Sequence, residues 1–138
     1  MIDLKECIEK RLLRRVPASR DKAVQSIEKA KTLLVEAKAD LEDERLNSAI
    51  VISYLSIFHA ARAVLFKDGY REKSHECIIR YLEETHSEIP QKTIELLDKF
   101  KSERTQTQYN INYYPTEDKT EKMISFTEKF IHEIEEII

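Results

Sequence analysis

One apolar stretch, Ser48 to Tyr70, constrains the fold of this chain more than any other feature. From Ala49 to Phe66 the only formal charge is that of Arg62. Apolar residues fall on every side of a helical wheel, so we expect a helix that neighbouring elements enclose. The run approaches the roughly 20 apolar residues of a membrane span, but polar side chains interrupt it, so we expect no membrane insertion. Gly69 is suited to end this helix in the left-handed conformation.

The composition favours helices over sheets. The chain has 138 residues with one glycine and three prolines, and sheets usually require more turn-forming glycine. Charged residues make up 36% of the chain and the net charge is −3, which is typical of soluble helices with ion pairs on their outer faces. The overall charge does not indicate nucleic-acid binding, so any basic site must be local.

The two cysteines, Cys7 and Cys77, are far apart in the sequence. Two cysteines without close spacing or an apolar leader do not indicate a disulfide framework. We therefore expect both to be small residues within helices. A cytoplasmic location follows from the same pattern.

The spacing of apolar residues predicts five or six helices within a single domain, residues 1–138. A short N-terminal helix is expected within residues 1–16, before the break at Pro17, and the bundle is expected over residues 19–138. In the helix after Ser19, apolar residues four and three apart form a narrow seam, which indicates packing on a near-parallel neighbour. We predict an all-α fold, an antiparallel up-and-down bundle of four long helices plus one or two short ones.

The helix expected after Pro90 contains an apolar stripe that becomes polar after Phe100. The first residue of its polar half is Arg104. A core helix would normally keep an apolar stripe along its whole length. The change from apolar to polar residues is therefore a candidate functional surface. A guanidinium there can bind phosphate with two hydrogen bonds. Tyr109 and Tyr113, which follow, can stack on bases or donate from the phenol. The alternative is an arginine–tyrosine cluster at a subunit interface.

Two further groups of side chains are candidates. Arg71, Lys73 and His75 gather donors around one loop beside a helix N-terminus, where they can hold a phosphate or form an ordinary polar loop. His59 and Arg62 share a face of the buried helix. We interpret them as a structural pair linked to an acidic residue elsewhere, because a buried charge requires a partner.

The four histidines fall on four different predicted elements. No two of them have the spacing of metal ligands on a helix. We expect no metal site and no cofactor.

The central motifs resemble the HEPN domain (higher eukaryotes and prokaryotes nucleotide-binding). Tyr54 is followed by Phe-His-Ala-Ala-Arg-Ala over residues 58–63, then by Gly69-Tyr70 and by Lys-Ser-His over residues 73–75. The pattern is similar to that of small prokaryotic HEPN proteins often encoded beside a minimal nucleotidyltransferase. The resemblance covers the chain from about residue 20 to its end.

The resemblance implies a helical bundle that forms a homodimer and pairs with a minimal nucleotidyltransferase as in toxin–antitoxin systems. Many HEPN toxins are metal-independent ribonucleases with an arginine followed, four to six residues later, by a histidine. Arg104 stands at the arginine position here, and Tyr109 stands where the histidine is expected. A phenol is a poor proton shuttle near neutral pH. We therefore expect a nucleotide- or RNA-binding partner protein with a degenerate catalytic motif.

Two alternatives stay open. The chain can be an active metal-independent endoribonuclease toxin, in which Arg104 and Tyr109 are catalytic. It can also be a structural dimerisation module, in which the polar break of the stripe serves only the dimer interface.

Overall fold

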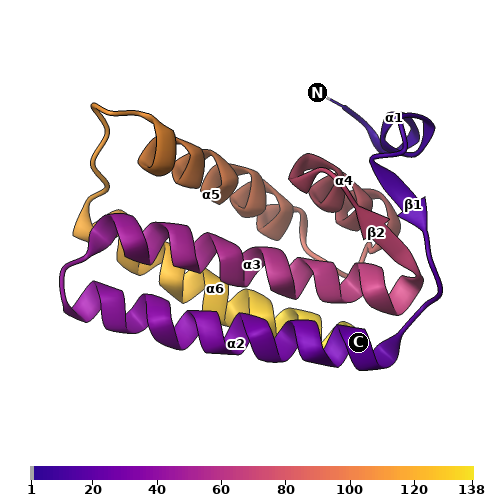
Figure 1. The fold of residues 1–138 in the computed structure, drawn as a ribbon, viewed down its shortest axis with the longest axis horizontal. Coiled ribbons are helices and arrows are strands. Elements are labelled where there is room, and N and C mark those ends of the chain that lie inside the picture. The colour runs from indigo at the N-terminus through magenta and orange to yellow at the C-terminus, as the bar shows by residue number, and fades with distance from the viewer. Residues whose placement is uncertain (1) are drawn as a thin grey trace.

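A computed structural model describes residues 2–138 and shows a helical bundle with one very small sheet (Figure 1). The four long helices are α2 (Arg20–Glu42), α3 (Leu46–Asp68), α5 (Gln91–Tyr109) and α6 (Glu117–Ile137). The short elements are α1 (Leu4–Glu9), β1 (Leu13–Arg15), β2 (Tyr70–Glu72) and α4 (His75–Thr85). The predicted all-α bundle of four long and two short helices is confirmed.

Helix α3 is the centre of the bundle. It packs against α2, α6, α5 and α4, and Figure 1 shows α2 antiparallel beside it, with α5 and α4 on its other side. Within residues 2–138, α3 is the one helix long and apolar enough to cross a membrane, and 61% of its most apolar window is buried in the bundle. The prediction of an enclosed central helix is confirmed.

The ends of the long helices follow local sequence signals. Ser19 and Thr116 accept hydrogen bonds from the backbone N–H groups of Lys22 and Lys119, so each caps its helix. Gly69 ends α3 with φ +88°, in the left-handed region. A Cβ at Gly69 would lie 2.8 Å from the carbonyl oxygen of Val16. Only glycine suits this position, because the chain reverses there against the segment that leads into α2.

The N-terminal segment differs from the helix expected over residues 1–16. Helix α1 ends at Glu9, Arg11 has φ +57°, and β1 then pairs antiparallel with β2. The pairing buries the side chain of Leu13 and leaves the two arginines of β1 exposed. The expectation that residues 10–15 continue the helix was wrong because this pairing with a distant segment overrides local helix propensity.

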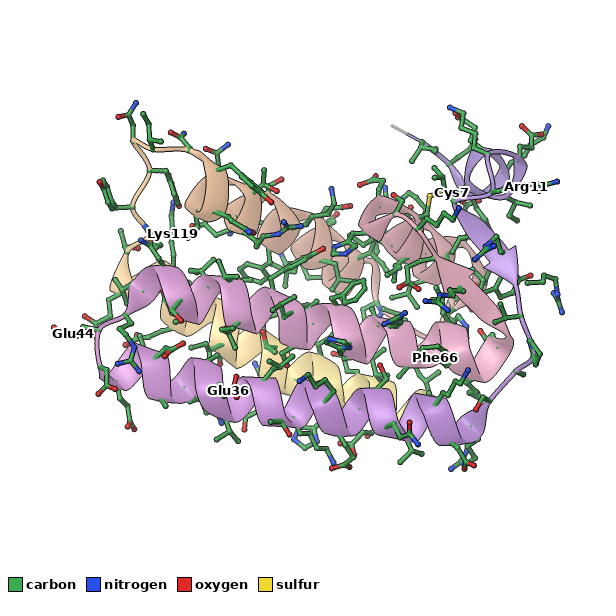
Figure 2. All side chains as sticks on the ribbon, viewed as in Figure 1. Cys7, Arg11, Glu36, Glu44, Phe66 and Lys119 are labelled. Carbon is green, nitrogen blue, oxygen red and sulfur yellow. A yellow bond between two sulfur atoms is a disulfide. The ribbon has the colours of Figure 1, made fainter. Side chains whose placement is uncertain are left out.

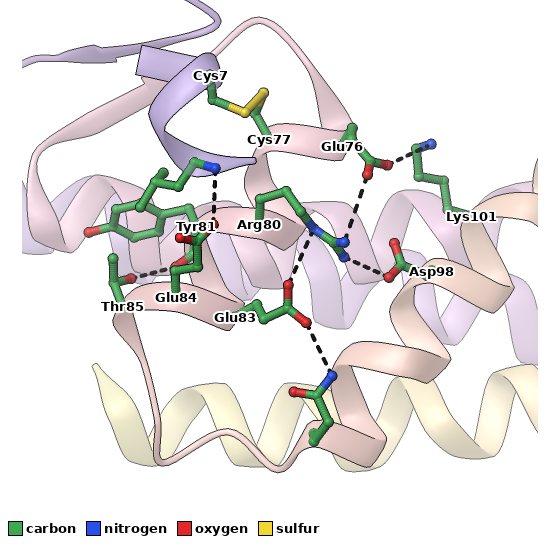
Figure 3. A network of polar contacts seen from close by, with 12 residues as sticks. Cys7, Glu76, Cys77, Arg80, Tyr81, Glu83, Glu84, Thr85, Asp98 and Lys101 are labelled. Atoms are coloured by element: carbon green, nitrogen blue, oxygen red, sulfur yellow. Dashed lines mark hydrogen bonds and ion pairs between the residues drawn. A yellow bond between two sulfur atoms is a disulfide. The ribbon is translucent and has the colours of Figure 1, made fainter. Parts of the chain in front are cut away.

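Cys7 and Cys77 are joined by a disulfide that ties α1 to α4 (Figure 3). Both residues are fully buried, and the backbone N–H of Leu4 also donates to the Glu84 carboxylate at the other end of α4. The expectation of two unpaired cysteines was therefore wrong. The two residues are 70 positions apart, so nothing local in the sequence indicates that they meet.

A buried arginine joins α4 to α5. Arg80, with its side chain 4% exposed, lies 2.6 Å from Asp98 and within ion-pair distance of Glu76 and Glu83 (Figure 3). Lys101 of α5 adds an ion pair to Glu76 at 3.4 Å. These contacts fix the start of α4 beside the second half of α5, where the polar break of the stripe begins.

Candidate phosphate-binding site

Four side chains from three helices meet where α4 begins. The guanidinium carbon of Arg104 on α5 lies 4.6 Å from the ring centroid of Tyr54 on α3. The Tyr54 hydroxyl is hydrogen-bonded to Nδ1 of His75 over 2.8 Å. The His75 ring in turn stacks on Phe58, with 4.2 Å between the ring centroids. We refer to these residues, Tyr54, Phe58, His75 and Arg104, as the Arg104–His75 cluster.

The local sequence accounts for this convergence. Tyr54 and Phe58 are four residues apart on α3 and therefore share one face. Ser74 is extended, so His75 is the first residue of α4 and its ring can reach that face. Arg104 follows Phe100, the last buried residue of the apolar stripe of α5, so its aliphatic stem approaches the core while the guanidinium stays near the surface.

Arg104 keeps unused hydrogen-bond donors. Its Nη1 donates to Oε1 of Gln108 over 3.3 Å. Its Nε is buried and has no hydrogen-bond partner, and no carboxylate forms an ion pair with the guanidinium, within the part of the chain that the structure describes. A guanidinium has five N–H donors, so those of Nη1 and Nη2 that Gln108 and Tyr54 do not occupy can bind an oxyanion.

His75 and Tyr54 are both uncharged near neutral pH. Burial lowers the pKa of His75, and the nearby cations Arg104, Lys101 and Arg62 lower it further. Burial raises the pKa of the Tyr54 phenol, although Arg104 opposes that shift. The pair therefore offers one neutral imidazole beside a permanent positive charge.

The hollow beside the cluster is small and apolar. It is lined by Tyr54, Phe58 and His75 together with Ala61 and Leu97, and its volume is about 20 Å³. That volume is close to the minimum that holds one water molecule. A base cannot enter it, so a ligand of Arg104 has to lie on the surface of the cluster.

Comparison with known protein families agrees with the fold. The sequence model of the HEPN domain matches residues 23–137. The chain belongs to the HEPN family. A search of curated proteins found no match to the sequence. The matched part of this HEPN domain runs from the first turn of α2 to the end of α6, and it includes every residue of the Arg104–His75 cluster.

In this HEPN domain the two tyrosines predicted beside Arg104 lie elsewhere. Tyr109, at the end of α5, is 67% exposed and makes no hydrogen bond or ring contact with Arg104 among the described residues. Tyr113 donates a short hydrogen bond to Glu103, and Lys119 lies over its ring and donates to its hydroxyl. The structure thus brings His75 to Arg104, and it brings neither Tyr109 nor Tyr113 there.

The basic loop residues of this HEPN domain separate. Arg71 and Lys73 are exposed, and Arg71 lies opposite Arg14 in the two-stranded sheet. The ring of His75, by contrast, packs against α3. His75 is therefore separated from the two exposed cations of this loop.

His59 and Arg62 lie near each other on α3, and of the two only Arg62 has an acidic partner among the described residues. The Nε of Arg62 lies 2.8 Å from Oε1 of Glu72, and its guanidinium lies over the rings of Phe58 and Phe66. The acidic partner expected for this pair is thus Glu72, and it faces Arg62. Burial lowers the pKa of His59, as do the nearby cations Arg62 and Lys29.

Sequence reasoning did not assign a site role to Tyr54 and Phe58. The one available indication was their spacing of four residues within the motif that contains His59 and Arg62. For metals, the structure contains no group of three or more metal-ligating side chains within residues 2–138.

Proposed function

We propose that this HEPN domain binds the phosphate of RNA or of a nucleotide at the Arg104–His75 cluster. One observation carries the proposal: the Arg104 guanidinium lies beside a histidine whose pKa is lowered, and no carboxylate forms an ion pair with that guanidinium within residues 2–138. Because the Nε is buried and a ligand has to lie on the surface of the cluster, the oxyanion would accept from the Nη groups of Arg104. Tyr54 beneath the guanidinium supports this role, because it limits the rotamers of Arg104.

The proposal includes the partner expected for such a chain. The domain is proposed to act as a homodimer that pairs with a minimal nucleotidyltransferase in a toxin–antitoxin-like system. The motif from Tyr54 to His75, which resembles HEPN proteins encoded beside such enzymes, supports this part. Co-expression of the tagged chain with a minimal nucleotidyltransferase, followed by co-purification, tests the pairing, and two proteins that elute separately would contradict it.

A second candidate function is metal-independent cleavage of RNA with His75 in place of the missing motif histidine. The specific observation is the neutral state of His75 beside Arg104. In this reaction the ribose 2′-hydroxyl attacks the adjacent phosphorus and its proton passes to the imidazole. Arg104 stabilises the charged phosphorane. The 5′-oxygen leaves and takes a proton from solvent, so the products are a 2′,3′-cyclic phosphate and a 5′-hydroxyl.

One set of variants tests both functions. Fluorescent single-stranded RNA is incubated in EDTA with the wild type, Arg104→Gln, His75→Gln and, as a control, Tyr109→Phe. Loss of one charge-assisted contact of roughly 1.5–3 kcal/mol predicts that Arg104→Gln weakens binding by about 10-fold to 100-fold. The control should bind like the wild type because Tyr109 is 67% exposed and makes no hydrogen bond or ring contact with the cluster among the described residues.

The outcomes separate the candidates. Cleavage that disappears in His75→Gln supports the ribonuclease, whereas binding without cleavage supports the non-catalytic module. A folded wild type that binds neither RNA nor any nucleotide contradicts both. If Arg104→Gln changes only the mass measured by light scattering, the structural dimerisation module is the correct alternative.

A further inference from the structure

Two hollows adjoin along the surface between α2 and α3. Their volumes are about 350 and 410 Å³, which is within the usual range for ligand sites, and they share Lys22 and Phe66 in their linings. We call the joined surface the basic groove. Its basic and aromatic side chains are Lys22, Lys29, His59, Arg62, Phe66 and Arg71.

The helical repeat builds this groove from two facing rows. Lys22, Ser26 and Lys29 recur along one side of α2, and His59, Arg62 and Phe66 recur along the facing side of α3. Figure 2 shows Phe66 towards the C-terminal end of α3, next to α2. The two lysines are seven residues apart, or roughly 10 Å along the helix axis. The groove is thus an elongated track rather than a closed pocket.

The charged side chains that line the groove are all basic, although Arg62 is paired with Glu72 at 2.8 Å. No carboxylate lines either hollow, although the chain contains 26 acidic residues and has a net charge of −3. Lys22, Lys29 and Arg71 are exposed and form no ion pair within residues 2–138. Such a track is suited to an extended polyanion.

The neighbouring sheet adds to the positive charge. Arg14 of β1 lies directly opposite Arg71 of β2, and both are exposed. Like charges opposite each other across two strands are destabilising, so this arrangement favours a counter-charge from outside the chain. The lowered pKa of His59, caused by burial and then by Arg62 and Lys29, agrees with a positive potential in the groove.

The groove also contains an aromatic side chain and reaches the Arg104–His75 cluster. Phe66 is partly exposed between the cations, with the guanidinium of Arg62 5.0 Å from its ring centroid. The same guanidinium lies 5.7 Å from the Phe58 ring centroid, and Phe58 stacks on His75. Arg62 therefore lies between the Phe66 ring of the groove and the Phe58 ring of the cluster.

We infer that the basic groove binds the backbone of single-stranded RNA, with a base stacked on Phe66, and that the strand continues from the groove to the Arg104–His75 cluster. Cations that follow a backbone and an aromatic ring that stacks a base are the two elements of single-strand recognition. The positive charge alone indicates a polyanion. The choice of RNA rests on the proposed function, and so does the continuation to the cluster.

The test measures binding of a fluorescent single-stranded RNA as a function of salt. The groove variant is Lys22→Gln/Lys29→Gln/Arg71→Gln. The matched control is Lys92→Gln/Lys99→Gln/Lys129→Gln, which removes the same charge from exposed positions on α5 and α6 that form no ion pair in the described part of the chain. The groove variant should bind at least about 10-fold more weakly, with a salt slope reduced by roughly 0.7 for each lost contact. The control should change affinity less than about 3-fold by the same electrostatic reasoning.

A further variant, Phe66→Leu, isolates the aromatic contribution. It should weaken RNA binding several-fold and leave the salt slope unchanged, because no charge is lost. Equal losses in the groove and control triples would overturn the inference, since the effect would then be one of net charge. A groove variant with altered oligomeric mass would also overturn it, because the groove would then be an interface between copies.

Arg104→Gln, measured alongside, separates the two proposals. Weaker binding in both Arg104→Gln and the groove variant supports the continuous path. A loss only in Arg104→Gln overturns the groove and leaves the proposed function. A loss only in the groove variant overturns the proposed function at the cluster and leaves the groove as an RNA-binding track.

Discussion

The guanidinium of Arg104 lies over the ring of Tyr54, 4.6 Å from its centroid, so a cation of α5 covers an aromatic side chain of α3. Such contacts contribute roughly 0.5–2 kcal/mol and limit the rotamers of the arginine. The same tyrosine holds His75 through its hydroxyl. Tyr54 therefore positions both of the polar groups that a phosphate would meet.

Tyr54→Phe separates these two roles. The variant keeps the ring beneath Arg104 but removes the hydrogen bond to His75, so the free energy of unfolding should fall by about 1 kcal/mol. RNA affinity should stay within about 3-fold of the wild type if Arg104 supplies the main contact, because that change is under 1 kcal/mol. Urea denaturation and fluorescence anisotropy measure the two effects. Tyr54→Leu is the companion variant, and unchanged affinity in it would show that the ring does not position Arg104.

The charge of Arg104 should be visible in the titration of His75. Burial and then Arg104 lower the pKa of His75 below its ordinary value of 6.5. Replacing Arg104 by glutamine removes a positive charge that disfavours protonation, so the pKa of His75 should rise towards that value. NMR titration of the imidazole resonances measures the change, with the distant exposed Arg11→Gln as control. An unchanged or lower pKa in Arg104→Gln would contradict the placement of the two groups.

The lowered pKa of His75 also makes stability depend on pH. Between the folded and unfolded pKa values, the unfolded chain binds more protons than the folded chain at this residue. The free energy of unfolding should therefore fall as the pH decreases through about 6.5, the ordinary histidine value. His75→Gln removes the contribution of His75, so the free energy of unfolding should vary less between pH 7 and 5. Some pH dependence should remain, because the pKa of His59 is lowered as well. Parallel profiles for wild type and variant would contradict the shift at His75.

The disulfide between Cys7 and Cys77 should stabilise the oxidised protein. It closes a separation of 70 residues, and the chain-entropy relation assigns about 4 kcal/mol to a loop of that size. Dithiothreitol should therefore lower the melting temperature of the wild type. The control is Cys7→Ser/Cys77→Ser, whose melting temperature should be lower and indifferent to the reductant. A wild type that contains two titratable thiols after purification under air would show that the bond does not form.

The fold was predictable from the sequence because its main signals are local. Three signals act within a few residues of the chain. They are the apolar residues on all sides of α3, the helix caps Ser19 and Thr116, and the left-handed glycine after α3. What was missed depends on contacts between distant segments. Leu13 joins a strand only because Glu72 lies opposite it, and Cys7 meets Cys77 only because α1 packs on α4. No local sequence pattern predicts these contacts.

The candidate site was predictable only in part for the same reason. Arg104 stands out because it interrupts an apolar stripe, which is a property of one helix. The arrival of His75 at Arg104 depends on how α4 crosses α3 and α5, and the ion pair of the buried Arg80 with Asp98 links α4 to α5 there. The exposed position of Tyr109 likewise follows from where α5 ends and not from its spacing to Arg104.

Gly69 should be the least replaceable small residue of the chain. It has φ +88°, and a Cβ there would lie 2.8 Å from the carbonyl oxygen of Val16. Gly69→Ala should therefore lower the free energy of unfolding by roughly 1–3 kcal/mol, from left-handed strain together with the clash. Gly69→Asn tests the two causes separately, because asparagine tolerates the left-handed region but carries the same Cβ. Equal losses in both variants would assign the cost to the clash, whereas a smaller loss in Gly69→Asn would assign most of it to the backbone. A Gly69→Ala protein as stable as the wild type in urea would contradict the turn geometry that joins α3 to β2.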